Sequence, residues 1–175
     1  MPFSLPGVKP GSDIESLFKA IGFVVIQWGH AEQALDLIVA VIFYRFGGNP
    51  LLTRRPKMLA EKLKFLSKCF LQIPELEKYR VDGEALLSRF AITGKKRHDL
   101  VHGAITNLSC ENGAFIFAEI DVNQDGHAVR SVVLHQSEFP ALIKELLGLG
   151  ADANKFARKI LDSTLRLAKG KGMKQ

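Results

Sequence analysis

A single long helical pattern constrains the fold of this chain more than any other feature. It runs from Ser12 to about Phe46, and a Gly47-Gly48-Asn49-Pro50 segment ends it. Its apolar positions recur at spacings of three and four, the period of an α-helix: Leu17, Ile21, Val24, Trp28, Ala31, Leu35, Ile38 and Ile42. From Leu35 onward the pattern is apolar nearly all round, so the helix must be covered on every side. In a chain of this size, a partner subunit is one way to cover it.

The ends of the helical segments carry recognisable signals. Ser12 and Glu15 form a capping-box sequence at the start of the first helix. Further helical patterns run over residues 56–71, from 74, from 82 to about 103, and from 138 to about 168. Pro56 fits the first turn of its helix, and Ser137 is the predicted cap of the last one. We expect that last helix to be interrupted near Gly148 and Gly150, because glycine weakens helices.

Between the helical segments, at about residues 104–135, the pattern indicates β-structure. Three short runs are rich in β-branched and aromatic residues: 105–110, 115–122 and 128–135. Asn112-Gly113 and Asp125-Gly126 separate them, and both dipeptides are hairpin signals. The sequence therefore predicts a mainly α-helical single domain over residues 12–168, with a small three-stranded antiparallel meander inserted before the C-terminal helices. Residues 1–11 form an extended arm in this prediction, and residues 169–175 form a basic tail.

Composition narrows the class of protein. The chain has 175 residues, and its 47% hydrophobic content is enough for a substantial core. The net charge is +6 and the pI is near 9.4. Such an excess favours a polyanionic partner, because displaced counterions drive phosphate binding, although ordinary solvated helix faces would give the same excess.

Cellular location is the next expectation. Cys69 and Cys110 fit free thiols in a reducing compartment. The chain starts without a basic region ahead of an apolar stretch, so it lacks the pattern of a signal peptide. The longest apolar run, residues 37–44, falls short of the ~20 residues that span a bilayer. We expect a cytoplasmic protein without membrane contact.

The densest group of titratable side chains is the segment Arg97-His98-Asp99-Leu100-Val101-His102-Gly103. His98 and His102 are four positions apart and share a helix face. Arg97 and His102 are about 140° apart on an ideal helix, so they meet only if the arginine wraps or the helix unwinds towards Gly103. The carbonyl groups of a last helical turn favour a cation, which would promote a protonated His102. An imidazole that moves a proton beside a guanidinium suits a phosphate or a developing phosphorane.

This segment resembles the Arg-x4-His motif of the HEPN superfamily, in which a polar residue usually follows the arginine; here His98 fills that position. The first helix adds Trp28-Gly29-His30-Ala31-Glu32-Gln33-Ala34-Leu35-Asp36, and the second adds Lys57-Met58-Leu59-Ala60-Glu61-Lys62-Leu63. The similarity covers about residues 12–103 and the C-terminal helix, while the meander looks like a family-variable insertion. The resemblance implies a HEPN-like helical bundle that is usually dimeric.

The resemblance also implies an activity. Many HEPN proteins are metal-independent ribonucleases with arginine and histidine from two protomers facing across the interface. On that pattern Arg97 would stabilise the transition state, His102 would be the general base or acid, and His98 would orient or polarise. It implies an endoribonuclease without a cofactor that acts on RNA as a homodimer, in a toxin or phage-defence setting where an antitoxin protein is an expected partner. We expect Lys95 and Lys96 beside the motif to contact RNA.

Two acidic residues complete the predicted site. Asp99 lies within the motif, and Glu32 lies one turn after Trp28 on the same helix face. If Glu32 is buried it needs a cationic partner, for which Arg97 is the candidate. The alternative is an exposed glutamate on a helix edge.

Other interpretations of the motif stay open. His98 and His102 with Asp99 have a metal-ligand spacing, although no third ligand at matching spacing is evident. In a structural interpretation, Arg97 pairs with an acid and both histidines cap carbonyl groups. The superfamily also contains inactive members, so the alternative function is a non-catalytic dimerisation or nucleic-acid- or nucleotide-binding module.

Spacing by itself is weak evidence, as a second match in this chain illustrates. Arg130 and His135 also fit Arg-x4-His, but they fall in a predicted strand, where positions five apart point to opposite faces. We expect His30, His127 and His135 on the surface or in loops, and Trp28 in the core.

Overall fold

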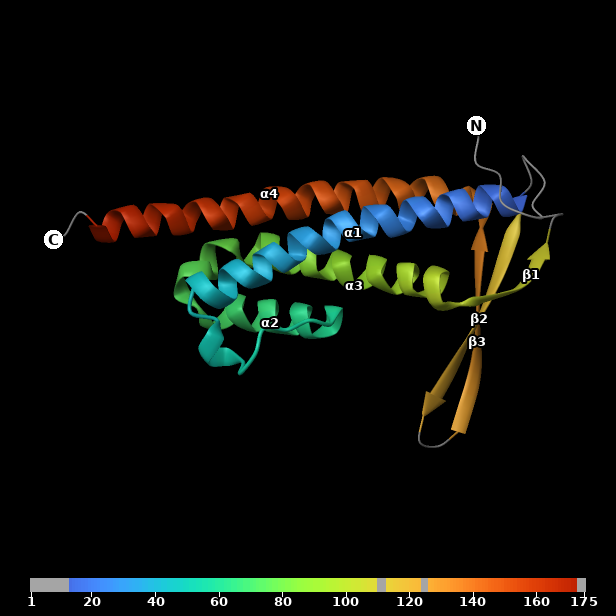
Figure 1. Cartoon of the computed structure of the whole chain (residues 1–175), viewed down its shortest axis with the longest axis horizontal. Helices are drawn as coiled ribbons and strands as arrows, with labels where there is room; N and C mark the ends of the chain where they lie inside the picture. Colours follow the sequence, from blue (N-terminus) through green and yellow to red (C-terminus); the bar gives the residue numbers. More distant parts are fainter. Residues whose placement is uncertain (1–12, 110–112, 124–125, 173–175) are drawn as a thin grey trace. The chain divides into compact units, whose positions relative to one another are not determined.

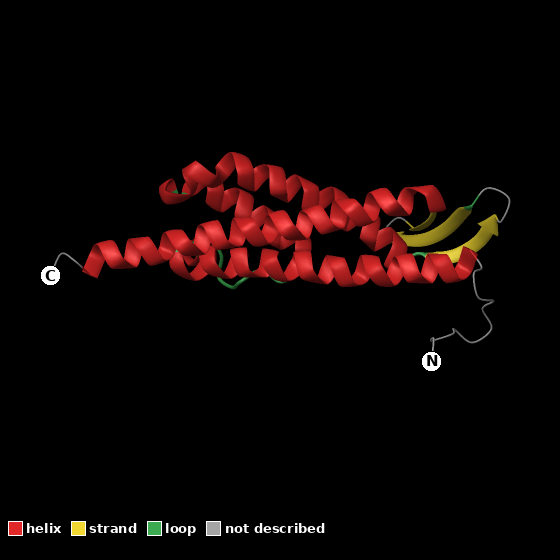
Figure 2. Ribbon diagram, turned by 90° about the horizontal axis from the view of Figure 1, so that it is seen from above, coloured by secondary structure: helices red, strands yellow, loops and turns green. Residues whose placement is uncertain are grey.

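A computed structural model describes residues 13–109, 113–123 and 126–172 of the chain. It confirms a mainly α-helical protein with a small three-stranded antiparallel sheet (Figure 2). Along the sequence the sheet follows the third helix and precedes the fourth. The elements, in chain order, are α1 (Asp13–Arg45), the 3₁₀ turn η1 (Asn49–Leu51), α2 (Leu59–Gln72), the 3₁₀ segment η2 (Pro74–Tyr79), α3 (Arg80–His102), β1 (Ala104–Ser109), β2 (Ala114–Asn123), β3 (Gly126–His135), the 3₁₀ turn η3 (Gln136–Glu138) and α4 (Phe139–Gly172). Within these ranges, no helix combines the length and apolar character that crossing a membrane requires.

The chain divides into two compact units, each built from discontinuous segments. The first unit combines Met1–Trp28 with Lys95–Leu146, and the second combines Gly29–Gly94 with Leu147–Gln175. The helices α1, α3 and α4 each contribute residues to both units. The extent of one domain over residues 12–168 stays a prediction.

The second unit has a core of aliphatic and aromatic side chains. Its largest fully buried side chains are Leu35, Ile38, Ile42, Leu66, Phe70, Leu76, Phe90 and Leu149. Phe70 and Tyr79 both meet the Phe156 ring edge-on, with ring centroids 6.0 and 6.2 Å away. Cys69 is a free thiol in this core, and burial raises its pKa to about 12. Cys69 is thus a free thiol as predicted, while Cys110 lies outside the described residues.

The first unit contains the sheet, with strand order β1-β2-β3. Its buried side chains come from α1, the end of α3, β2 and the start of α4: Leu17, Val24, Trp28, Leu100, Phe115, Phe117, Phe139, Leu142 and Leu146. The Phe115 and Phe139 rings pack at 5.9 Å, which joins β2 to α4. Pairing between β1 and β2 reaches only to Ala104 and Ala118, so β2 beyond that point pairs with β3 alone. Figure 1 shows this two-stranded ribbon extending past β1.

One predicted helix start and one predicted helix cap were wrong. The second helix begins at Leu59, since the Glu61 carboxylate accepts hydrogen bonds from the backbone N–H groups of Lys57 and Met58, at 3.4 and 3.5 Å. Ser137 does not cap the last helix, because it lies inside the 3₁₀ turn η3; His135 caps this turn, its backbone N–H donating to Glu138 at 2.8 Å, and α4 follows from Phe139.

The predicted interruption of the last helix was also wrong. The helix α4 continues through Gly148 and Gly150 to Gly172, and it includes the first four residues assigned to the basic tail. Both glycines lie where a neighbour comes close: a Cβ at Gly148 would be 3.3 Å from an Arg89 guanidinium nitrogen, and one at Gly150 would be 3.9 Å from the Ala31 nitrogen. Tertiary packing therefore outweighs the low helix propensity of glycine here.

Two glycines of the predicted turns adopt the left-handed conformation. Gly47 has φ of +73°, as its role in ending the first helix requires, and Gly113 of the first hairpin dipeptide has φ of +58°. Ser12, Asn112 and Asp125 lie outside the described residues, as does the arm at 1–11.

Candidate functional site

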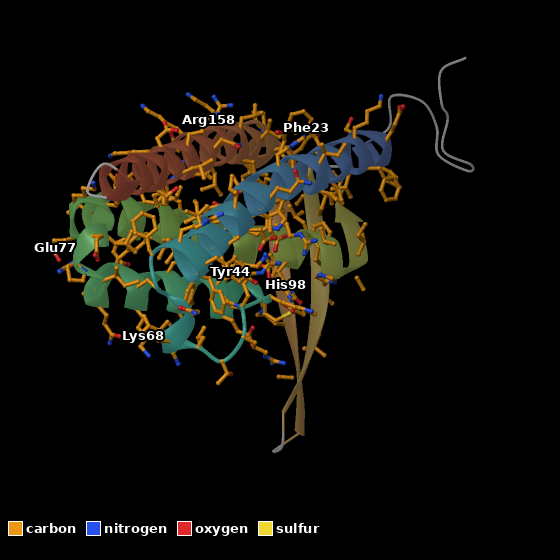
Figure 3. The ribbon with its side chains drawn as sticks, turned by 60° about the vertical axis from the view of Figure 1, so that its left-hand side comes forward. Phe23, Tyr44, Lys68, Glu77, His98 and Arg158 are labelled. Atoms are coloured by element: carbon orange, nitrogen blue, oxygen red, sulfur yellow. The ribbon has the colours of Figure 1, made fainter. Side chains whose placement is uncertain are left out.

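The motif residues gather at the C-terminal end of α3, in the first unit. Figure 3 shows His98 there among side chains that carry nitrogen and oxygen atoms. The helix is regular through His102, and Gly103 directly follows it. Arg97, His98, Asp99 and His102 therefore lie within the last two turns of one helix.

Arg97 contacts His102 directly. The distance from Arg97 Nη1 to His102 Nε2 is 3.3 Å. Because α3 is still helical at His102, the arginine side chain wraps around the helix to make this contact. A guanidinium can only donate, so the contact is a hydrogen bond only when Nε2 carries no proton. The geometry therefore favours an imidazole with its proton on Nδ1, whereas the helix-end argument alone favoured a protonated His102.

The same arginine has one donor without a partner. Arg97 Nε is buried and has no hydrogen-bond partner among the described residues. Leaving such a donor unsatisfied costs about 1–3 kcal/mol, so native structures rarely do it without a reason.

His98 faces a carboxylate from the sheet. His98 Nε2 lies 2.8 Å from Glu119 Oε1 on β2, and its ring lies 4.7 Å from the His102 ring, centroid to centroid, with a tilt of 43°. A carboxylate accepts hydrogen bonds, so His98 carries a proton on Nε2 in this contact. The two imidazoles thus have different partners although they share one helix face.

Arg130 on β3 connects this arrangement to Asp99. Arg130 Nη2 donates to Asp99 Oδ1 at 2.5 Å and also to Glu119. Glu119 and Arg130 are directly opposite each other in the β2–β3 register. The hydrogen bonds from Arg130 and then His98 hold the pKa of Glu119 below its ordinary value, and those to Asp99 and Glu119 raise the pKa of Arg130.

Gly103 allows the helix end to approach the sheet. A Cβ at this position would lie 2.5 Å from the Asp99 carbonyl oxygen and 2.9 Å from Phe117 Cβ on β2. Gly103 is not among the described glycines with positive φ, so lack of space is the reason for glycine here, rather than the left-handed conformation expected after a helix. Its backbone N–H bonds to the Asp99 carbonyl at 3.1 Å.

The lysines before the motif are free to meet a ligand. Lys95 and Lys96 are exposed on α3, and neither has an ion pair within the described part of the chain. Their contact with RNA stays a prediction. The Asp99 carboxylate, a possible metal ligand in the sequence analysis, accepts a hydrogen bond from Arg130. Among the described residues, no group of three or more His, Cys, Asp and Glu side chains has an arrangement that would hold a metal ion.

Glu32 belongs to the second unit, where the cation that pairs with it is Lys62. Lys62 Nζ is 3.0 Å from Glu32 Oε1 and 2.9 Å from Asp36 Oδ1, and only 4% of the Lys62 side chain is exposed. We predicted that Glu32, if buried, would pair with a cation, with Arg97 as the candidate; its side chain is 34% exposed, and the cation that pairs with it is Lys62. This pairing joins α2 to α1.

Sequence reasoning missed Glu119 and Arg130. The Asp125-Gly126 dipeptide did not identify them, because as the two central residues of a hairpin turn it would put Glu119 opposite Val132. In the structure Gly126 belongs to β3 and pairs with Asn123, and this register puts Glu119 opposite Arg130. We did not take Arg130 and His135 as a second motif, because residues five apart on a strand point to opposite faces. In the structure Arg130 bonds to Asp99 and Glu119, whereas His135 is exposed and caps η3.

The histidines and Trp28 outside the motif follow expectation where they are described. His30 and His135 are exposed, Trp28 is 5% exposed, and the side chain of His127 is outside the described set. No protein-family model matches the chain, and neither a curated protein nor a solved structure matches it.

Proposed function

We propose that this chain is a metal-independent endoribonuclease of the HEPN type that uses Arg97 and His102. The observation that carries the proposal is the 3.3 Å contact between the Arg97 guanidinium and His102 Nε2 at a helix end, beside a buried Arg97 Nε that has no described partner. The contact joins a phosphate-binding group to a proton acceptor.

The chemistry follows from which atoms are available. A scissile phosphate would draw the Arg97 guanidinium onto its non-bridging oxygens, which frees the lone pair of His102 Nε2. That nitrogen takes the proton of the ribose 2′-hydroxyl as its oxygen attacks phosphorus. The bond from phosphorus to the 5′-oxygen breaks, and the 5′-oxygen takes a proton from water. Lys95 and Lys96 would bind the neighbouring phosphates.

Self-association is part of the proposal. In the first unit, α1 presents an uncovered apolar strip at helical spacing, with Phe18 42%, Val25 40% and Ile26 60% exposed. Gly22 lies within this strip and has nothing near its Cβ position, so another backbone can approach closely there. These features support a second copy of the chain as the occupant, because equal strips from two copies are self-complementary. The toxin or defence setting, an antitoxin partner and a cytoplasmic location rest on the family resemblance and composition alone.

The test is an RNA cleavage assay of the wild type against His102→Ala, in excess chelator. We expect the wild type to degrade RNA and the variant to lose this activity while its circular dichroism spectrum is unchanged. Undiminished cleavage by the variant, or a strict metal requirement, would contradict the proposal.

A second candidate is a non-catalytic RNA-binding module. It is favoured by the same contacts viewed as a structural tie, since Arg97, His98 and Asp99 each bond to a group of the chain itself. Binding of RNA that weakens with salt, without turnover, would distinguish it from the nuclease.

A further inference from the structure

The β-meander adds two residues to the helix-end site. We propose that Glu119 and Arg130 are positioning residues that hold His98 with its proton on Nε2, the tautomer opposite to that of His102, whose proton the Arg97 contact keeps on Nδ1. The meander is then a working part of the site. For its effect on catalysis this inference rests on the proposed function, whereas the tautomers are a property of the protein itself.

Glu119 fixes the tautomer of His98. The 2.8 Å contact joins a carboxylate oxygen to Nε2, and the partly buried Glu119 side chain is 24% exposed. A carboxylate that accepts from one imidazole nitrogen fixes both the tautomer and the ring orientation. Nδ1 is then the nitrogen through which His98 exchanges protons.

Arg97 fixes the opposite tautomer at His102. The Arg97 guanidinium can donate to Nε2 only if that nitrogen has a lone pair, which puts the proton of the neutral ring on Nδ1. The two rings are 4.7 Å apart. Opposite tautomers therefore place one donor and one acceptor nitrogen of each ring in defined directions within a few ångströms.

Arg130 holds Glu119 in place beside the helix end. It bonds to Asp99 on α3 and to Glu119 on β2, so one guanidinium ties the helix end to the strand that carries the carboxylate. The Asp99 side chain is only 12% exposed, which strengthens this tie relative to a fully solvated pair. Arg130 and Arg97 together also offset the charges of Asp99 and Glu119, so the two carboxylates do not repel a polyanion.

Nitrogen-15 NMR of histidine-labelled protein tests the inference, because two-bond correlations report which ring nitrogen carries the proton. At about pH 8, where histidine side chains are ordinarily neutral, we expect Nε2–H for His98 and Nδ1–H for His102. In Glu119→Ala we expect His98 to lose its single tautomer while His102 keeps its own. Glu119→Gln retains an acceptor oxygen and should preserve the His98 tautomer, and it keeps the assay interpretable if the alanine variant folds poorly.

Activity gives a second readout with matched controls. We expect Glu119→Ala and Arg130→Met to lower kcat on the order of 10–100-fold with little change in KM, as removal of a group that orients a functional histidine does. Glu75→Ala and Arg158→Met, at exposed positions of the second unit, should leave kcat unchanged. A wild-type His98 with its proton on Nδ1, or an unchanged His98 tautomer in Glu119→Ala, would overturn the inference even if RNA is cleaved. If no RNA is cleaved but the tautomers behave as stated, the nuclease proposal fails and the positioning role stands.

Discussion

Glu119 and Arg130 form a directly opposed cross-strand pair, and Arg130 extends from that pair to Asp99 on α3 at 2.5 Å. The pair thereby connects a β-hairpin to the end of a helix that carries an arginine and two histidines. Because Glu119 contacts His98 and Arg130 contacts Asp99, the geometry of the site depends on residues more than 15 positions away from the motif in sequence.

Replacing Arg97 with lysine tests whether the planar guanidinium matters. Lysine keeps the charge but cannot bridge two phosphate oxygens in a fixed plane, so we expect kcat/KM to fall on the order of 10²–10³-fold. The measurement is a steady-state cleavage assay on a short RNA. Lys96→Arg is the matched control and should change activity less than about threefold. Equal activity of Arg97→Lys and the wild type would argue against a bidentate role.

Acidification should weaken the contribution of Glu119 to stability. Its pKa is lower in the folded protein than its ordinary value of 4.5. Its ionisation therefore contributes stability in full above that value, and the contribution disappears as the pH falls through the lowered value. Thermal unfolding of the wild type and Glu119→Gln from about pH 7 to about pH 3 measures this. The difference in Tm should narrow below pH 4.5; a difference independent of pH would contradict the prediction.

A methyl group at Gly103 should destabilise the first unit. The added Cβ would clash with the Asp99 carbonyl oxygen and with Phe117 Cβ, and relief requires the helix end and β2 to move apart. We expect a loss of about 1–3 kcal/mol in the free energy of unfolding, measured by urea denaturation. Gly29→Ala is the control, because nothing lies within 4 Å of its Cβ position in α1, and it should gain about 0.5–1 kcal/mol.

The cation at Lys62 should stabilise the contact of α2 with α1. Lys62→Met keeps the apolar stem but leaves Glu32 and Asp36 without this cation. Because both carboxylates are partly exposed and regain water, we expect a moderate loss of about 1–2 kcal/mol rather than the larger penalty of a buried charge. A double-mutant cycle with Glu32→Gln in urea denaturation isolates the pair, and a coupling energy near zero would show that Lys62 acts through packing alone.

A charge in the apolar strip of α1 should prevent self-association. Ile26→Asp places a carboxylate at the most exposed apolar side chain of the strip formed by Phe18, Gly22, Val25 and Ile26. We expect a dimer for the wild type at micromolar concentration and a monomer for the variant, by size-exclusion chromatography with light scattering. Because Leu71 on α2 is equally exposed outside this strip, Leu71→Asp is the control and should not dissociate the dimer. A monomeric wild type would remove the two-protomer site from the proposal.

Local signals predicted most of the fold. The three-and-four spacing from Leu17 to Ile42 predicted α1, and the hairpin dipeptides predicted the antiparallel order of the three strands. What failed were signals that depend on distant neighbours. Gly148 and Gly150 look like breaks in a single helix, but packing against Arg89 and Ala31 keeps α4 continuous.

The candidate site divides in the same way. Arg97, His98, Asp99 and His102 are adjacent in sequence, so their common helix end followed from periodicity. Glu119 and Arg130 join them through the tertiary docking of the sheet, which no local pattern encodes. The pairing of Glu32 likewise depended on which helix packs against α1, and Lys62 on α2 provides the cation.

The ribbon of β2 and β3 has a base that carries Glu119 and Arg130 and a tip whose length can change without moving them. Glu119 and Arg130 form the first pair beyond Ala118, the last β2 residue that also pairs with β1, and the ribbon then continues to Asn123 and Gly126. Each pair of residues inserted between Asn123 and Gly126 lengthens the ribbon outward by about 3.3 Å per residue along each strand. Such insertions leave the pairing of Glu119 with Arg130 unchanged, so the length of the hairpin can vary without altering this part of the site.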